Sequence, residues 1–110
     1  MGSGFGGLAA LIRLRQGHDV LAVEQADAIG GTWRDNSYPG AGCDVPSALY
    51  SYSFAPNPDW SARYAGQAEI LDYLRRTAES HAATRSIRFG TRLLRGDWDE
   101  DDRRWRLETS

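Results

Sequence analysis

Apolar residues near the start of the chain form a short helical pattern that is followed by a continuous apolar run. The helical pattern consists of Leu8, Leu11, Ile12 and Leu14. It predicts a mostly apolar helix over Leu8–Arg15 that packs on a sheet. The run Val20–Glu24 is apolar at consecutive positions and ends in an acid, which is typical of a short buried strand in a parallel sheet.

The second half of the chain carries the clearest helical period. Ile70, Leu71 and Leu74 mark the apolar face of a helix predicted over Gln67–Ala83. A short strand is expected next, at Ser86–Phe89. The segments Leu93–Trp98 and Trp105–Glu108 then flank an acidic turn, which predicts a β-hairpin with Trp98 and Trp105 as a cross-strand pair.

The segment Gln25–Pro58 has no sustained period and is rich in glycine, proline and aromatic residues. Long irregular segments in a compact domain are usually functional, so we interpret this one as a loop region that wraps a ligand. Tyr50, Tyr52 and Phe54 alternate within it as in a half-buried strand. Together these elements predict an α/β fold, a partial Rossmann-type domain over residues 1–110 with a β-hairpin excursion.

Composition narrows the class of protein. The 110 residues make at most one ordinary domain, with thirteen Lys and Arg against fifteen Asp and Glu. No basic block stands out, which argues against a nucleic-acid surface, and no apolar run is long enough for a membrane span. Cys43 is the only cysteine, so no internal disulfide is possible and a cytoplasmic setting is expected. Two isolated histidines and one cysteine predict no metal site.

The first seven residues contain the pattern G-x-G-x-x-G at Gly2, Gly4 and Gly7. In a dinucleotide site these glycines serve a tight turn, a close approach to a pyrophosphate and close helix packing. Glu24 lies near the expected ~20 residues downstream, where an acid binds a ribose hydroxyl. The fingerprint is shared by NAD and FAD proteins, and the alternative for Glu24 is a solvated strand end.

Only Met1 precedes the glycine turn, whereas the motif normally follows a hydrophobic strand. We therefore expect the first strand of the sheet to be missing. Because that strand is central in the usual order, its loss should leave an exposed parallel edge and bare apolar surface.

Further motifs follow in fixed order and spacing: Gly30-Gly31-Thr32-Trp33-Arg34, Tyr38-Pro39-Gly40, Cys43–Ser47, Tyr50–Phe54, Trp60, Tyr64, Glu69–Leu74 and Phe89-Gly90-Thr91. With the glycine turn and Glu24, they resemble the flavin-containing Baeyer–Villiger monooxygenases, within the wider class of single-chain flavoprotein monooxygenases. The resemblance covers nearly the whole chain.

The resemblance implies FAD as a cofactor and assigns roles to particular residues. Gly2, Ser3, Gly4 and Gly7 would hold the pyrophosphate, and Glu24 would bind the adenosine ribose. Gly30, Gly31, Thr32 and Trp33 would follow the pyrophosphate and flavin. The remaining assignments place Cys43, Asp44 and Tyr50 by the isoalloxazine and Leu93 where backbone groups meet the adenine.

The resemblance also implies a reaction. In such enzymes NADPH reduces the flavin, O₂ adds, and the flavin peroxide converts a small-molecule ketone to an ester or lactone. Asp44 would act in catalysis by orienting an arginine above the flavin. That arginine and the NADPH site belong to later parts of the family's chain.

The family's inter-domain signature and second glycine-rich motif have no match here. We therefore expect an N-terminal fragment of a larger flavoprotein with two nucleotide-binding domains. One alternative is a related flavoprotein that oxygenates nitrogen or sulfur. Another is a truncated, non-catalytic chain that neither binds FAD tightly nor turns over, and the oligomeric state is left open.

Overall fold

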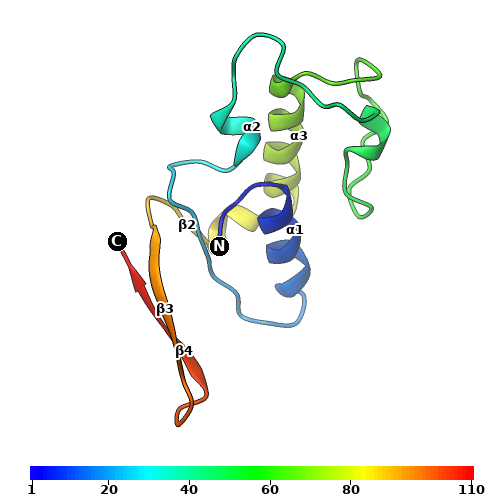
Figure 1. Ribbon diagram of the computed structural model, residues 1–110. Coiled ribbons are helices and arrows are strands. Elements are labelled where there is room, and N and C mark those ends of the chain that lie inside the picture. The colour runs from blue at the N-terminus through cyan, green and yellow to red at the C-terminus, as the bar shows by residue number, and fades with distance from the viewer.

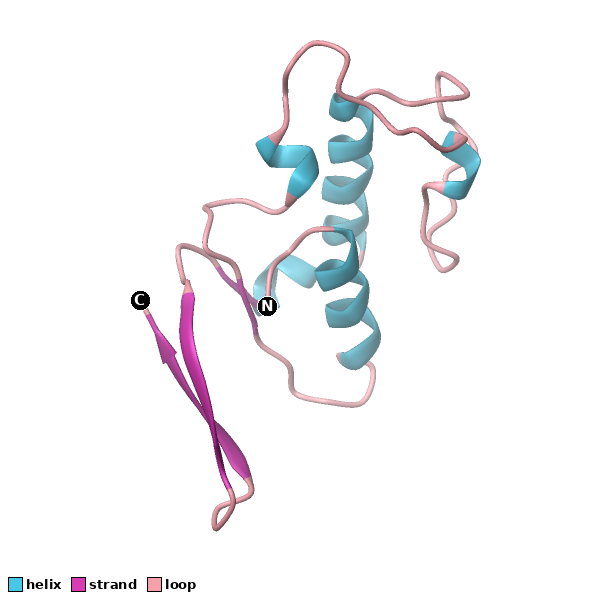
Figure 2. Cartoon of the chain, in the orientation of Figure 1, coloured by secondary structure: helices cyan, strands magenta, loops and turns pink.

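The computed structural model describes all residues, 1–110, as a mixture of helices, short strands and long loops (Figures 1 and 2). The elements in chain order are α1 (Phe5–Leu14), β1 (Ala22–Val23), α2 (Thr32–Asp35), the 3-10 helix η1 (Ser47–Leu49), α3 (Gln67–Ser80), the 3-10 helix η2 (Ala83–Ser86), β2 (Ile87–Arg88), β3 (Leu93–Asp99) and β4 (Arg104–Thr109).

The parallel sheet consists of β1 and β2 alone, with Ala22 opposite Ile87 and Val23 opposite Arg88. The predicted strands lie where expected, but each is only two residues long. Along the other edge of β1, the Gly2 N–H donates to the Val23 carbonyl at 2.8 Å. The first turn is therefore fastened to the sheet by its backbone.

Helix α1 begins at Phe5, three positions before the predicted start, because the glycine turn leads directly into helical backbone. Leu8, Leu11 and Ile12 are buried as expected, whereas Leu14 is 48% exposed. Leu14 was expected on the apolar face, but the buried residues follow the i, i+3, i+4 rule and position 14 falls outside that stripe.

Helix α3 carries the predicted apolar face, and Ile70, Leu71 and Leu74 join residues of α1, β1 and β2 in one hydrophobic core. The helix ends at Ser80 rather than Ala83. Ala82 adopts a left-handed φ of 49°, which ends the helical path. The Arg15 guanidinium donates to the carbonyls of His81 and Ala82 at 3.2 and 2.8 Å, and thereby satisfies the helix end.

The segment between α2 and α3 is irregular, as expected, apart from η1. The predicted strand at Tyr50–Phe54 is wrong, because this stretch forms only an isolated bridge between Tyr52 and Ala55. The Tyr52 N–H donates to the Tyr73 hydroxyl instead of a neighbouring strand. Aromatic packing against Phe5, at a centroid distance of 4.8 Å from Tyr50 and 5.2 Å from Tyr52, explains their partial burial.

Strands β3 and β4 form the predicted hairpin and extend away from the helices (Figure 1). Trp98 lies opposite Trp105, and their ring centroids are 5.7 Å apart in an edge-to-face arrangement. The radius of gyration is 15.8 Å, compared with about 13 Å for a compact chain of this length. None of the helices combines the length and apolar character that crossing a membrane requires.

Candidate functional site

The first glycine turn leads from the edge of β1 into α1. Gly2 has a left-handed φ of 83°, which a side chain would disfavour. A Cβ on Gly7 would lie only 2.1 Å from the Gly2 carbonyl oxygen. Gly7 therefore permits the first turn of α1 to close over the backbone that precedes it.

The N-terminus of α1 offers hydrogen-bond donors. Gly4 is the N-cap residue but supplies no side-chain cap, and the first turn contains no acid. The N–H groups of Gly4, Phe5, Gly6 and Gly7 donate to no backbone carbonyl. Unpaired N–H groups and the helix dipole together favour an anion such as a phosphate.

A second glycine turn contacts the first. Gly30 and Gly31 have φ values of 131° and 52°, and the Gly30 N–H donates to the Ser3 carbonyl at 3.0 Å. A Cβ on Gly31 would lie 3.1 Å from the Gly4 Cα. The two turns thus pack backbone against backbone at the start of α1.

Glu24 follows β1 and is only 4% exposed, so the interpretation of a solvated strand end is wrong. Its Oε2 accepts the Ser3 N–H at 2.8 Å and the Ser3 hydroxyl at 2.7 Å, and its Oε1 accepts the Ala26 N–H at 2.9 Å. Burial alone would raise the pKa of Glu24. The hydrogen bonds from Ala26 and Ser3, together with the positive charge of Arg34, outweigh burial and lower that pKa.

Arg34 lies on the other side of the Glu24 carboxylate. Its Nη1 is 3.5 Å from Glu24 Oε1 and donates to the Ala28 carbonyl at 2.5 Å. Its Nε and Nη2 donate to the two carboxylate oxygens of Asp35 at 2.8 and 3.1 Å. The hydrogen bonds to Asp35 raise the pKa of Arg34, so this side chain stays a cation.

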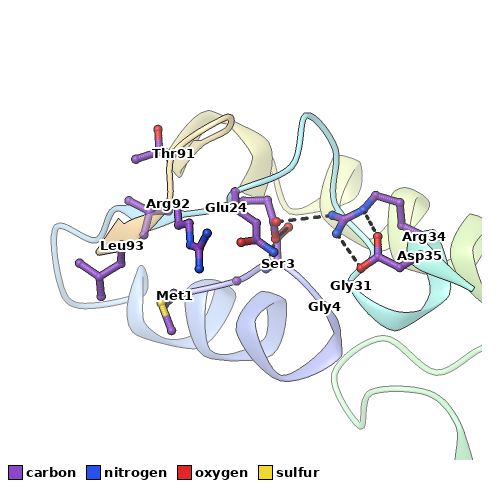
Figure 3. A pocket seen from close by; sticks show the side chains of 13 residues that line it. Met1, Ser3, Gly4, Glu24, Gly31, Arg34, Asp35, Thr91, Arg92 and Leu93 are labelled. Atoms are coloured by element: carbon purple, nitrogen blue, oxygen red, sulfur yellow. Dashed lines mark hydrogen bonds and ion pairs between the residues drawn. The ribbon is translucent and has the colours of Figure 1, made fainter. Parts of the chain in front are cut away.

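These groups line an open cleft of about 450 Å³, drawn in Figure 3. Of the residues predicted for the site, the cleft brings together Gly2, Ser3, Gly4, Glu24, Gly31 and Leu93. The Ser3 hydroxyl is directed at Glu24 rather than left free for a ligand. The predicted residues that do not line the cleft are Gly7, Gly30, Thr32, Trp33, Cys43, Asp44 and Tyr50.

Several residues that line the cleft were not predicted for the site, notably Gln25, Arg34, Asp35, Thr91 and Arg92. A signal for the last two was available, because ligands in α/β sheets bind beyond the carboxyl ends of the strands, and both residues follow β2. Arg34 offered a weaker signal, as a cation directly after the second glycine turn.

Two other predicted residues, Trp33 and Tyr50, contact each other away from the cleft. The Trp33 Nε1–H donates to the Tyr50 hydroxyl at 3.0 Å, and the two rings meet edge to face at 5.5 Å. Cys43 is buried and forms no disulfide, whereas Asp44 is exposed. None of these four residues lines the cleft at the glycine turns.

Comparison with known proteins decides the family. The model for the NAD(P)-binding Rossmann-like domain matches residues 1–66. The chain belongs to this family. This Rossmann-like chain is also similar to much longer proteins, of which it corresponds to a short N-terminal part.

One relative is a Baeyer–Villiger monooxygenase of Streptomyces coelicolor, 50% identical over 111 residues, which cover 99% of this chain and 21% of that protein. Among solved structures, an oxidised steroid monooxygenase bound to NADP matches with a TM-score of 0.93 and 47% identity, over 98% of this chain and 22% of that one. A complex of OTEMO with FAD and NADP matches with a TM-score of 0.93 and 34% identity, over 98% and 21%. The Rossmann-like chain therefore spans about a fifth of the length of these relatives.

Proposed function

We propose that this Rossmann-like chain serves a FAD- and NADPH-dependent monooxygenase of Baeyer–Villiger type, in which it binds the ADP half of FAD. One observation carries the proposal. The first glycine turn, packed against the second, presents unpaired N–H groups beside the buried carboxylate of Glu24, in a chain 50% identical to a Baeyer–Villiger monooxygenase. This combination suits a diphosphate and an adjoining ribose.

The roles of the residues follow from their chemistry. Gly4 and the first turn of α1 would hold the diphosphate, and Glu24 would accept a ribose hydroxyl. Leu93, which lines the same cleft, would meet the adenine through its backbone. Gly2, Gly7 and Gly30 permit the turns, and Ser3 holds Glu24.

The contacting pair Trp33 and Tyr50 would face the flavin end of the cofactor. In this proposal Thr32, Trp33, Cys43 and Tyr50 border the isoalloxazine, and Asp44 orients an arginine outside this chain. When bound, FAD supplies the redox and oxygen chemistry, and the protein supplies binding and orientation. A small ketone and O₂ would be the substrates, in a cytoplasmic enzyme.

A chimera tests this function. The corresponding segment of the Streptomyces coelicolor enzyme is replaced by these residues, and the purified protein is assayed for bound FAD and for NADPH-dependent conversion of a ketone. We expect a yellow protein that forms an ester or lactone. A folded chimera that retains no FAD would contradict the proposed site, and product oxygenated at nitrogen or sulfur but never at a ketone would contradict the reaction.

We also propose that the 110 residues alone do not turn over. The core contains 14 buried hydrophobic residues, the parallel sheet has two short strands, and the hairpin lies uncovered. Gel filtration of the purified chain with FAD should separate the flavin from the protein. A flavin-bound monomer that oxidises NADPH would refute this part of the proposal.

A further inference from the structure

The acidic side chains in the cleft would repel the diphosphate of the proposed ligand. Glu24 and Asp35 contribute two carboxylates to its lining, and a diphosphate would add further negative charge beside them. Two cations, Arg34 and Arg92, balance these acids. Since charges of the same sign repel one another, these cations act with the unpaired N–H groups of the first turn to let the cleft accept a diphosphate.

Arg34 is the cation with a fixed place. Its side chain is 17% exposed, and hydrogen bonds to Ala28 and Asp35 hold the guanidinium on two sides. In Figure 3, dashed lines join it to both Glu24 and Asp35. Arg92, by contrast, has an exposed side chain and forms no ion pair.

The second glycine turn packs closely against Arg34. A Cβ on Gly30 would lie 2.8 Å from the Arg34 Cβ, so glycine at position 30 leaves room for the side chain at position 34. The same turn contacts Gly4 at the start of α1. Arg34 therefore joins the strand-end acid to the loop that borders the helix N-terminus.

We propose that Arg34 is a positioning residue that holds the Glu24 carboxylate in place and compensates the acids of the cleft, so that a nucleotide diphosphate can bind there. The inference rests on the proposed nucleotide site and adds a residue to it. Loss of Arg34 would leave Glu24 and Asp35 opposed only by Arg92. Binding should then weaken with each phosphate on the ligand.

The test compares adenosine, AMP and ADP by NMR titration of the full chain, because chemical shifts detect weak binding. In Arg34→Met we expect adenosine to weaken least, because Ser3 and Ala26 still hold the Glu24 carboxylate that meets the ribose. AMP should bind on the order of tenfold more weakly, and ADP more weakly still. Arg34→Lys should recover much of the loss, and adding Asp35→Asn to Arg34→Met should recover part of it. Arg75→Met, which removes an exposed and unpaired cation on α3, is the matched control and should leave all three affinities unchanged.

Equal weakening of all three ligands in Arg34→Met would overturn the inference, since a merely structural role predicts that result. If the unmodified chain binds none of them, the nucleotide site proposed for this chain fails. The positioning role of Arg34 is then decided by the titration of Glu24, which needs no ligand. Titration of the ¹³C-labelled Glu24 carboxylate should show a higher pKa in Arg34→Met but not in Arg34→Lys. An unchanged Glu24 titration in Arg34→Met would overturn the positioning role.

Discussion

Ser3 donates two hydrogen bonds to a single oxygen of Glu24, from its backbone N–H at 2.8 Å and from its hydroxyl at 2.7 Å. Both residues are buried, with 2% and 4% of their surface exposed. A residue of the first turn thus satisfies the acid at the end of the strand beside it. This contact fixes the geometry of the cleft before any ligand binds.

Ser3→Ala removes the hydroxyl but keeps the backbone N–H. Hydrogen bonds to charged groups contribute about 1.5–3 kcal/mol, so we expect the free energy of unfolding at pH 7 to fall by about that amount. Urea denaturation followed by circular dichroism measures it. Ser53→Ala, at an exposed position without a side-chain hydrogen bond, is the control, and an equal effect of the two substitutions would contradict the importance of the contact.

Stability should fall in acid because of Glu24. The pKa of Glu24 is lower in the folded chain than its ordinary value of 4.5. A group with a lowered folded pKa stabilises the fold fully above its unfolded pKa, and that stabilisation is lost as the pH falls through the folded value. The free energy of unfolding should therefore decrease below about pH 4.5.

Unfolding at a series of pH values in Glu24→Gln checks the source of this dependence. The variant should be less stable at pH 7 and should lose less stability on acidification. Glu69, whose pKa is lowered by hydrogen bonds from Ser61, makes a separate contribution to the pH dependence of the free energy of unfolding. Glu108→Gln changes an exposed strand residue without an ion pair and serves as the control. An unchanged pH profile in Glu24→Gln would rule out this assignment.

The order of helices and strands could be predicted from the sequence, because the spacing of apolar residues indicates which side chains are buried. The sequence placed both long helices and the hairpin, and it identified Gly2 as the site of a tight turn before the first helix. It did not predict Arg34, whose partners Glu24, Ala28 and Asp35 come together only through the path of an irregular loop. The strand predicted at Tyr50–Phe54 failed for a related reason, since the same spacing also suits side chains packed around Phe5 without a neighbouring strand.

Gly7 and Gly6 are adjacent in α1 but should respond oppositely to alanine. A Cβ at Gly7 would lie 2.1 Å from the Gly2 carbonyl oxygen, whereas a Cβ at Gly6 meets nothing within 4 Å. Overpacking typically costs about 1–3 kcal/mol, and Gly7→Ala should reach at least that value because the obstacle is backbone. Gly6→Ala should stabilise α1 by roughly 0.5–1 kcal/mol, the usual advantage of alanine in a helix.

Thermal denaturation of both variants measures this difference. Gly6→Ala controls for the general effect of adding a methyl group to the first turn of the helix. Two variants of similar stability would show that the turn can relax around Gly7, and the tight packing of α1 over Gly2 would then be wrong.

The hairpin should unfold separately from the helical core. Every residue of β4 is exposed, and an isolated hairpin is marginally stable in water. The Trp98–Trp105 pair is expected to contribute about 0.5–1.5 kcal/mol. Trp105→Ala should therefore abolish protection of β3 and β4 amides from hydrogen exchange and leave the amides of α1 and α3 unchanged.

A substitution at Arg103 should increase, rather than decrease, the protection of the hairpin amides from hydrogen exchange. It adopts a left-handed φ of 50° in the turn of the hairpin, a conformation that costs a non-glycine residue roughly 1–2 kcal/mol. Arg103→Gly relieves this strain at some cost in chain entropy, so β3 and β4 amides should exchange more slowly while α1 and α3 are again unaffected. If either variant changed protection in the helices, the hairpin would be part of the same cooperative unit, because separate units respond independently.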